Sequence, residues 1–283
     1  MAATISKIEL KHKTMSVYYE KHIGEKKKPT LFFVHGLGGD LDAWKFIVKP
    51  LQKKGYSTIA IDLPGHGLSD HPKSAKFYKI QNLAESVKTV MQKEKLKEAV
   101  LVGHCFGAVI SLAFAASFPQ NLASLIIISP SFRPPHYINA EWKKILANHI
   151  INIVSFFSPP PIFPGHSTYP LGKYHKDYEW FGLAKTIIKN SLRSYLQSSK
   201  QIVNLDLENQ LNKIKTKTLI ITGENDTIFP LSISERIQSR IKNSKLEIIK
   251  GGNHVVVLNN TREIFRIINS HLETHQKKLD LSA

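Results

Sequence analysis

Apolar residues occur along this chain in short continuous runs, and most of these runs are followed by a segment in which apolar residues recur at helical spacing. A short continuous run is typical of a strand buried on both faces, and strands that alternate with helices are typical of a doubly wound parallel sheet. The runs predict strands over residues 30–34, 56–61, 98–102, 122–129, 216–222 and 245–249. The helical spacing predicts helices over residues 43–54, 80–96, 108–116, 233–241 and 259–273.

Two regions depart from this alternation. Residues 6–23 alternate in part and predict an opening hairpin with its turn near residues 11–13. Residues 131–215 contain no buried-strand pattern, and their apolar spacing predicts helices over residues 141–157, 178–197 and 202–211. The sequence therefore predicts an α/β core domain, with a mostly parallel central sheet flanked by helices, and a helical cap inserted into it. The core domain is made of residues 1–130 and 216–283, and the cap of residues 131–215.

The predicted cap is rich in aromatic and large apolar side chains. A cap must bury one face on the sheet domain, so we expect most of these side chains to pack there. The remainder are free to line an apolar acyl pocket or to touch a lipid surface. The residues concerned are Phe156, Phe157, Ile162, Phe163, Tyr169, Trp180 and Phe181.

Composition restricts where such a chain works. A single cysteine among 283 residues excludes an intrachain disulfide and fits a reducing compartment. Residues 1–13 carry charges throughout and lack the apolar stretch of a signal peptide. Residues 145–157 are too few and too polar to span a bilayer. The sequence therefore predicts a soluble cytoplasmic protein.

The formal net charge of +17 is large for this length. It can attract nucleic acid, an anionic membrane or an anionic carrier of acyl groups. The lysines are scattered from Lys7 to Lys278, however, and no nucleic-acid-binding motif accompanies them. We therefore favour solvated basic faces, expect no nucleic acid as partner, and keep an anionic carrier or membrane surface as the weaker interpretation.

The chain centres on residues 103–107, with the sequence GHCFG, which lie between a predicted strand and a helix of small residues. A strand, a G-x-nucleophile-x-G turn and a helix form a nucleophile elbow, in which glycines allow a sharp turn and the middle side chain projects above the sheet. The middle residue is Cys105, the only cysteine. A lone cysteine is usually a small buried apolar residue, but this position predicts a nucleophile.

Two more candidate residues follow predicted strands. Asp226 comes after the strand over residues 216–222, and His254 comes after the strand over residues 245–249. Ligand sites in open α/β sheets lie at the carboxyl edge of the strands, so we expect both residues to lie near Cys105. Asp226 could instead cap a turn, and His254 could be a loop histidine whose hydrogen bonds are satisfied locally.

With these motifs in order, the chain resembles the α/β-hydrolase superfamily, in particular its capped, lipase- and esterase-like members. The resemblance extends from about residue 6 to residue 273. It rests on the sequences HGLGG (35–39), DLPGHGLSD (62–70), GHCFG (103–107), GENDTIFP (223–230) and GGNH (251–254), in the superfamily's order nucleophile, acid, histidine.

The resemblance implies a role for each candidate. Cys105 would be the nucleophile and His254 the base, while Asp226 would fix the histidine tautomer. With a thiol, the imidazole can take the proton before substrate arrives, which gives a thiolate–imidazolium pair. The backbone N–H groups of Leu37 and Phe106 would form the oxyanion hole.

The other histidines and glycines of these motifs are expected to be structural. His104 neighbours the nucleophile, but side chains adjacent across such a turn point apart, and His35 and His66 are expected to hold their loops. No spacing such as H-E-x-x-H occurs, so we predict no metal. Residues 36–39 lack the G-x-G-x-x-G spacing of a dinucleotide site, so we predict no cofactor.

The resemblance implies a hydrolase of carboxylic esters or thioesters with an apolar acyl group, acting through an acyl-cysteine intermediate on a small-molecule substrate. Because a thioester also reacts readily with amines and thiols, an acyltransferase is the alternative. Cys105 could also be an engineered replacement of serine that traps an acyl intermediate. A ligand receptor without enzymatic activity is a further alternative, although retention of Cys105, Asp226 and His254 argues against it.

Overall fold

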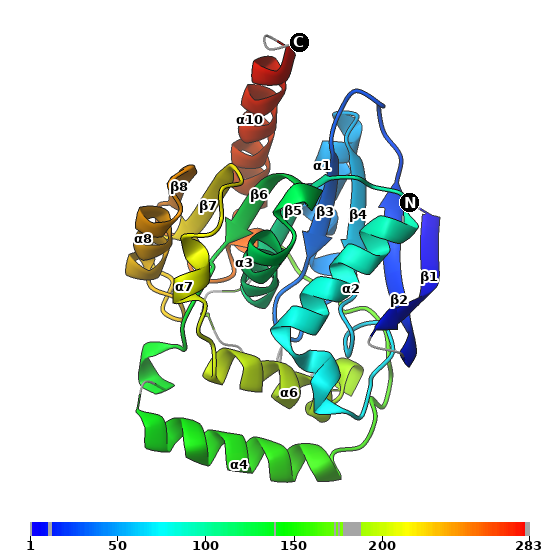
Figure 1. Ribbon diagram of the computed structural model, residues 1–283, viewed down its shortest axis with the longest axis vertical. Helices are drawn as coiled ribbons and strands as arrows, with labels where there is room; N and C mark the ends of the chain where they lie inside the picture. The colour runs from blue at the N-terminus through cyan, green and yellow to red at the C-terminus, as the bar shows by residue number, and fades with distance from the viewer. Residues whose placement is uncertain are drawn as a thin grey trace.

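The computed structural model describes residues 2–10, 13–138, 140–172, 174, 176–177 and 188–280. An eight-stranded sheet crosses the molecule in the order β1-β2-β4-β3-β5-β6-β7-β8 (Figure 1). Strands β3 to β8 run parallel, and β1 and β2 are antiparallel to their neighbours. The strands are β1 (Ala2–Leu10), β2 (Lys13–His22), β3 (Thr30–Val34), β4 (Ser57–Ile61), β5 (Ala99–His104), β6 (Leu122–Ile128), β7 (Thr218–Gly223) and β8 (Ser244–Ile249).

Sequence patterning predicted this sheet well. The mostly parallel sheet and the opening hairpin are confirmed, although residues 11 and 12 of the hairpin turn lie outside the described residues. The register β3–β5 pairs Val34 with Gly103, so the loops after both strands begin at the same level of the sheet edge. The predicted site residues therefore lie in loops that follow parallel strands, and these strands were predicted from the apolar runs.

Helices cover both faces of the sheet and build two cores. Along β3, Phe32 and Val34 point to one core, and Leu31 and Phe33 point to the other. Such alternation explains why the strand reads as a continuous apolar run, since each face is buried. The first core lies under α2 (Ile80–Lys93), α3 (Phe106–Ser117) and α8 (Leu231–Arg240), and the second under α1 (Lys45–Lys53), α9 (Val256–Asn259) and α10 (Thr261–Asp280).

Helix boundaries differ from the predicted ones by a few residues, for local reasons. A 3-10 turn, η1 (Leu41–Trp44), precedes α1, and the Asp40 carboxylate accepts the Asp42 N–H at its start. Helix α2 ends before residue 96 because Lys95 has a φ of 55°, which a continuing helix does not allow. Two further 3-10 turns of the core are η2 (Ala75–Tyr78) and η3 (Pro119–Asn121).

Between β6 and β7 the described residues contain turns and helices and no strand. We call residues 131–215 the inserted segment. It contains η4 (His136–Ile138), α4 (Glu141–Phe157), α6 (Leu192–Val203) and α7 (Glu208–Leu211). In Figure 1, α6 lies below the sheet and α4 lies beyond α6, at the bottom of the view. The predicted helix over residues 141–157 is thus confirmed, whereas the two others need correction.

The predicted helix over residues 178–197 is interrupted at Ser191, with helical residues on both sides, and residues 178–187 lie outside the described residues. Ser191 has a φ of 63°, and its side chain accepts the Ser194 N–H, so that α6 begins afresh at this point. The predicted helix over residues 202–211 is wrong, because α6 ends at Val203. Leu205 and Leu207 are both buried, and Leu207 donates its N–H to the carbonyl of Phe132. The residues between α6 and α7 therefore pack against the core and do not continue the helix.

The prediction that the inserted segment buries its aromatic residues holds for only some of them. Tyr169 packs against the second core. Phe156, Phe157, Ile162 and Phe163 are instead between 65% and 78% exposed, while Trp180 and Phe181 lie outside the described residues. Within the described part of the chain, no helix has the length and apolarity needed to cross a membrane.

Candidate active site

Cys105 occupies a strained turn between β5 and α3. Its φ of 53° and ψ of −114° lie outside the usual regions for a residue with a side chain, and its N–H donates to the Ile128 carbonyl at 2.9 Å. The two flanking glycines leave no room for a Cβ atom. A Cβ on Gly103 would lie 2.4 Å from the Gly107 oxygen, and a Cβ on Gly107 would lie 2.2 Å from the Val34 oxygen. The predicted elbow is therefore present, and close backbone packing explains both glycines.

Asp226 and His254 meet beside this turn. His254 Nδ1 donates to Asp226 Oδ2 at 2.8 Å, and both side chains are almost fully buried. The second oxygen, Oδ1, accepts the N–H groups of Ile228 and Phe229 at 3.0 and 2.8 Å. Burial favours the protonated carboxyl, but the bond to His254 and these N–H groups hold the pKa of Asp226 below its usual range.

Cys105 is near enough to His254 to act on its charge. Burial by itself lowers the pKa of an imidazole. Against it, electrostatic interaction with Cys105 and the bond to the Asp226 carboxylate raise the pKa of His254 to about 10. The structure thus brings the three predicted residues together at the elbow.

Two side chains form hydrogen bonds with the His254 carbonyl. His104 Nε2 donates to the His254 carbonyl at 3.0 Å, and burial together with the charge of His254 lowers the pKa of His104 to about 3. His104 is therefore neutral and structural, as its place in the turn predicted. Ser129 follows β6 with a φ of 45°, and its hydroxyl contacts both the His254 carbonyl, at 3.4 Å, and the Asp226 carboxylate. Sequence reasoning missed Ser129, because a serine after a strand carries no distinctive signal.

The loop after β3 lies against the elbow. A Cβ on Gly36 would lie 3.3 Å from the Cys105 Cβ, so only a glycine lets the loop come this close. The next residue is Leu37. Within the described residues, neither the Leu37 N–H nor the Phe106 N–H donates a hydrogen bond. Two N–H groups of this kind beside the Cys105 side chain form a place where an oxyanion can bind.

His35 and His66 fix this loop as neutral side chains. His35 Nδ1 donates to the Gly36 carbonyl at 2.8 Å, and His35 Nε2 accepts the Leu63 N–H at 3.0 Å. The two imidazole rings lie 4.9 Å apart, and burial lowers the pKa of both. The structural roles expected from the sequence therefore agree with the hydrogen bonds.

The inserted segment is fastened to the same loops by buried polar contacts. Asp62 accepts the Leu41 N–H and the Leu68 N–H at 2.9 Å each, and His166 of the inserted segment donates to Asp62 at 2.8 Å. Asn190 accepts the Gly67 N–H at 2.7 Å and donates to the Gly38 carbonyl at 2.6 Å. The inserted segment is therefore tied to both loops that flank the elbow.

Helix α6 of the inserted segment lies over the elbow. Tyr195 of α6 is mostly buried, and burial followed by the nearby charge of Cys105 raises the pKa of its phenol. Leu37, Cys105 and Ile228 pack, partly buried, against the first core. The surroundings of the thiol are thus apolar, apart from His254 and the phenol.

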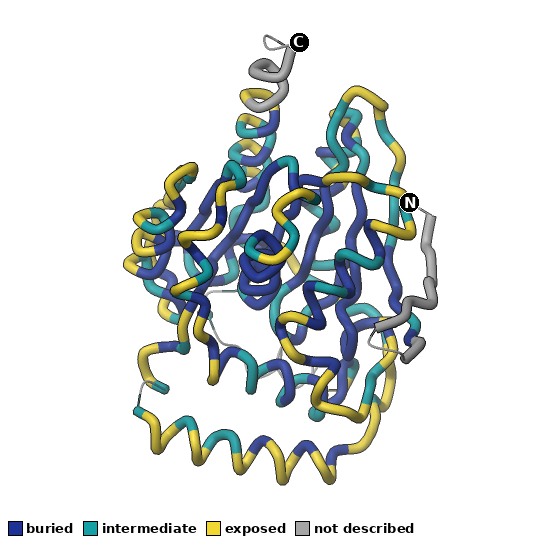
Figure 2. Tube along the Cα trace, in the orientation of Figure 1, coloured by how far each residue is buried: buried dark blue, intermediate teal, exposed yellow. Residues whose placement is uncertain are grey.

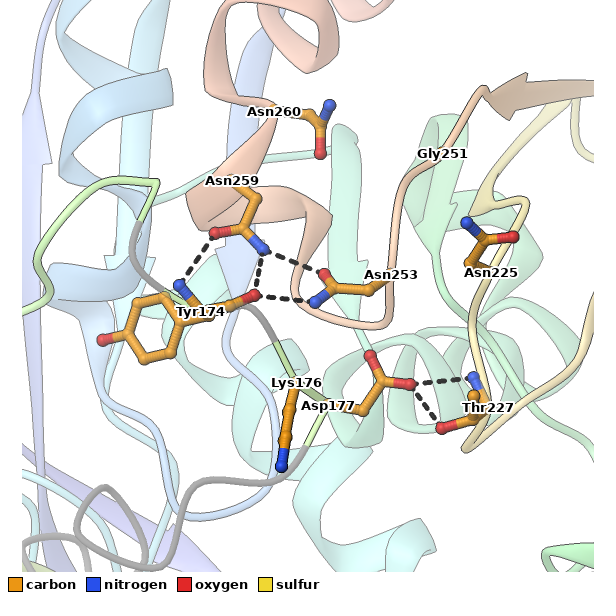
Figure 3. A pocket seen from close by; sticks show the side chains of 9 residues that line it. All are labelled: Tyr174, Lys176, Asp177, Asn225, Thr227, Gly251, Asn253, Asn259 and Asn260. Atoms are coloured by element: carbon orange, nitrogen blue, oxygen red, sulfur yellow. Dashed lines mark hydrogen bonds between the residues drawn. The ribbon is translucent and has the colours of Figure 1, made fainter.

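Asp177 is a second feature that sequence reasoning missed. Its Oδ1 accepts the His254 N–H at 2.6 Å, and its Oδ2 accepts the N–H and the hydroxyl of Thr227 at 2.9 and 2.5 Å. Figure 3 shows its carboxylate pointing at Thr227, one residue after Asp226. One carboxylate from the inserted segment therefore joins the loop that carries the acid to the loop that carries the histidine.

A cavity of about 620 Å³ opens beside Asp177 (Figure 3). Its lining is polar and includes Tyr174, Lys176, Asn225 and Asn253 in addition to Asp177. Cys105, Asp226 and His254 do not line it, so the cavity is separate from these three side chains. Among the described residues, no group of three or more His, Cys, Asp or Glu side chains is arranged to hold a metal.

Comparison with known proteins agrees with this architecture. A family model described as the alpha/beta hydrolase fold matches residues 29–149. The uncharacterized hydrolase YugF of Bacillus subtilis is 28% identical over 258 residues, which cover 86% of this chain and 89% of YugF. Human protein ABHD8 is 23% identical over 254 residues, which cover 87% of this chain and only 56% of ABHD8.

Among solved structures, a thermophilic esterase from Thermogutta terrifontis has a TM-score of 0.79 to this chain at 19% identity, over 96% of this chain and 99% of that one. A likeness at this identity concerns the fold. The family match, the strand order and the turn at residues 103–107 together show that the chain has the α/β-hydrolase fold.

Proposed function

We propose that the protein hydrolyses carboxylic esters or thioesters with an apolar acyl group, and that Cys105 carries the acyl group as a thioester. The observation that carries this proposal is the strained turn that presents Cys105 beside His254, whose imidazole is bonded to Asp226. A buried cysteine without a catalytic role needs neither a charged histidine partner nor a strained backbone.

In the proposed reaction, the Cys105 thiolate attacks the carbonyl carbon of the substrate and the carbonyl electron pair moves onto oxygen. The N–H groups of Leu37 and Phe106 bind the resulting oxyanion, and each such donor is worth about 10²–10³ in rate. When the tetrahedral intermediate collapses, the bond to the leaving group breaks. The leaving alcohol or thiol takes a proton from His254 Nε2, and the acyl-thioester remains on Cys105.

In the second half of the reaction, neutral His254 takes a proton from water, whose oxygen attacks the thioester carbonyl. The carbon–sulfur bond then breaks, which restores the thiolate and releases the carboxylic acid. Asp226 stays ionised and holds the imidazole by its Nδ1 atom throughout. The apolar acyl group is supported by Leu37 and Ile228, which pack with Cys105 against the first core.

The experiment is to mix the protein with short p-nitrophenyl esters and follow the mass of the intact protein. We expect a mass increase of one acyl group on Cys105, release of p-nitrophenol, and neither in the variant Cys105→Ala. No adduct and no turnover with any acyl chain length would contradict the proposal and favour a receptor.

Two additions to this experiment separate the alternatives. If amine, thiol or alcohol acceptors take the acyl group in preference to water, the enzyme is an acyltransferase. A Cys105→Ser variant that turns over faster than the parent would indicate that serine is the residue for which the site was built. We expect water to be the main acceptor and the serine variant to be slower.

A further inference from the structure

Helix α4 turns polar side chains toward the protein and most of its large apolar side chains toward solvent, which is the reverse of an ordinary surface helix. The side chains that face α6 include polar ones: Asn148 exchanges hydrogen bonds with Asn204, and Asn152 accepts from Lys200 at 2.7 Å. Ser155 is also buried on this side. Surface helices of globular proteins usually turn their apolar stripe to the protein and their polar side chains to water.

The outward face of α4 is made of large apolar side chains at helical spacing. With 3.6 residues per turn, positions 142, 145, 146, 150, 153, 156 and 157 lie on one side of the helix. Only the exposed His149 shares that side. Figure 2 shows most of the α4 tube as exposed. The exposed fractions are Trp142 65%, Ile145 56%, Leu146 52%, Ile150 52%, Ile153 61%, Phe156 78% and Phe157 77%.

The contacts of α4 hold this orientation. Arg193 of α6 donates to the carbonyls of Ser155, Phe156 and Ser158 at 2.8, 3.3 and 2.6 Å. Arg193 therefore adds hydrogen bonds to carbonyls at the end of the helix, and its charge lies at the negative end of the helix dipole. Phe156 and Phe157 are exposed beside a fixed helix end, and not because the end is frayed.

A neighbouring loop extends the apolar face. Ile162 and Phe163 are 65% and 70% exposed, and both donate their N–H groups to the carbonyl of Ile188, at 3.2 and 3.5 Å. Single apolar residues scattered over a protein surface are normal and need no explanation. Here several exposed apolar residues occur together. An exposed surface of this kind indicates an apolar environment that the isolated chain does not supply.

Charge decides which environment fits. The inserted segment contains eleven Lys and Arg residues against five Asp and Glu residues, and the whole chain has a formal net charge of +17. Lys143 and Lys144 lie on α4 itself, whose one acidic residue, Glu141, pairs with Lys144 at 2.7 Å. A second copy of the chain carries the same positive charge and is repelled, whereas a bilayer with anionic headgroups attracts it.

We propose that the outer face of α4, with the loop at Ile162 and Phe163, docks on the surface of an anionic lipid bilayer. A helix of this length is about 25 Å long. It would lie in the plane of the membrane, with Trp142 and Phe157 at its two ends inserted among the acyl chains and the lysines at headgroup level. This inference does not rest on the proposed function, because membrane binding is measured without any substrate.

The experiment is sedimentation of the whole chain with vesicles of phosphatidylcholine alone or with phosphatidylglycerol added. We expect binding to the anionic vesicles that is at least about tenfold stronger than binding to the neutral ones. We expect it to weaken strongly between ~0.01 M and ~1 M salt, as the screening length falls from about 30 Å to about 3 Å. Lipids with brominated acyl chains should quench the fluorescence of Trp142, and the variant Trp142→Phe should lose that quenching while still binding.

Substitutions identify the surface. We expect the double variant Ile153→Gln/Phe157→Gln to bind anionic vesicles at least about tenfold more weakly. The matched control is Ile23→Gln, because Ile23 is 79% exposed but follows β2 in the core domain, and it should bind like the parent. Circular dichroism checks that each variant is folded.

Three results would overturn the proposal. The first is no sedimentation with anionic vesicles at low ionic strength. The second is unchanged binding by the folded double variant, which would mean that another surface binds. The third is a dimer that the double variant abolishes, in a protein that ignores vesicles, since a second copy would then cover the face.

Discussion

The elbow after β5 and helix α4 arrange the same kinds of residue in opposite ways. At the elbow, apolar side chains are buried, and the buried polar groups Asp226 and His254 are hydrogen-bonded to each other. In α4 the apolar side chains face outward, and Ser155 has a buried hydroxyl without a partner among the described residues. The elbow is therefore complete within the chain, whereas the outer apolar side chains of α4 are exposed in the described part of the chain.

The difference shows what a periodic pattern specifies. Apolar spacing over residues 141–157 predicted the bounds of α4 correctly, because the spacing fixes which residues share a face. It did not predict which face points to the protein, because that depends on what each face meets. We expected most aromatic residues of the cap to pack on the sheet domain, and the exposure of Phe156 and Phe157 places these two among the remainder.

The largest effect is expected at the elbow glycines. The variant Gly107→Ala places a methyl group 2.2 Å from the Val34 oxygen and 2.6 Å from the His35 oxygen, both in backbone that cannot move aside. Overpacking of this kind costs about 3 kcal/mol, which outweighs the gain of about 1 kcal/mol from replacing a glycine in a helix. We expect calorimetry to show a melting temperature lower by roughly 4–8 °C, as a net cost of about 2 kcal/mol implies for a chain of this size.

Helix α4 supplies the contrast for this prediction. The variant Leu146→Ala removes a side chain that is 52% exposed, and we expect the free energy of unfolding to change by no more than about 0.5 kcal/mol. If Leu146→Ala destabilised the chain as much as Gly107→Ala, the proposed contrast between the two regions would be wrong.

The next effect is the pH dependence of the elbow. Because the pKa of His254 is raised to about 10, the imidazolium that pairs with the Cys105 thiolate persists as the pH rises through neutrality and is lost only near pH 10. We expect the acylation rate to stay level between about pH 7 and about pH 9, and to fall about tenfold for each pH unit above about 10. Stopped-flow release of p-nitrophenol measures this rate.

A rate that instead rises through about pH 6.5 would mean that His254 works as an ordinary neutral base. The thiolate–imidazolium pair would then be absent, although the triad could still operate. A pH-stability control on the unreacted protein, followed by circular dichroism, separates loss of the ion pair from loss of the fold.

Sequence reasoning reached the three side chains that meet at the elbow and missed those that hold them. Cys105, Asp226 and His254 follow buried strands in a family order, and such positions can be read from apolar runs. Ser129 and Asp177 carry no comparable signal. Each depends on a backbone N–H or carbonyl from another segment, and hydrogen bonds between distant loops exist only once the chain is folded.

A smaller effect is expected at Asp177, which joins the inserted segment to the loops that carry Asp226 and His254. The variant Asp177→Asn replaces one acceptor oxygen by an N–H₂ group, which faces either the His254 N–H or the Thr227 donors and cannot bind them. We expect kcat to fall about fivefold with little change in KM, because the imidazole loses its alignment while the elbow keeps its shape. Steady-state kinetics with a short ester measures both constants.

The matched control is Asp206→Asn, since Asp206 also belongs to the inserted segment but accepts only the Glu208 N–H, at 3.2 Å. We expect it to leave both constants as they are in the parent. Equal losses in the two variants would mean that Asp177 has a general structural role and does not position His254.

The smallest effect tests the orientation of α4 directly, with two isoleucines two residues apart. Ile151 is 7% exposed and faces α6, whereas Ile153 is 61% exposed and faces outward. We expect Ile151→Gln to lower the free energy of unfolding by about 1 kcal/mol, since part of a buried side chain loses its apolar contacts. Ile153→Gln should change it by no more than about 0.5 kcal/mol, because water meets that side chain in the folded and the unfolded chain alike. Urea unfolding in the absence of lipid measures both values. If Ile153→Gln were the more damaging of the two, the apolar face of α4 would be buried in solution, and the reason to place it on a membrane would be lost.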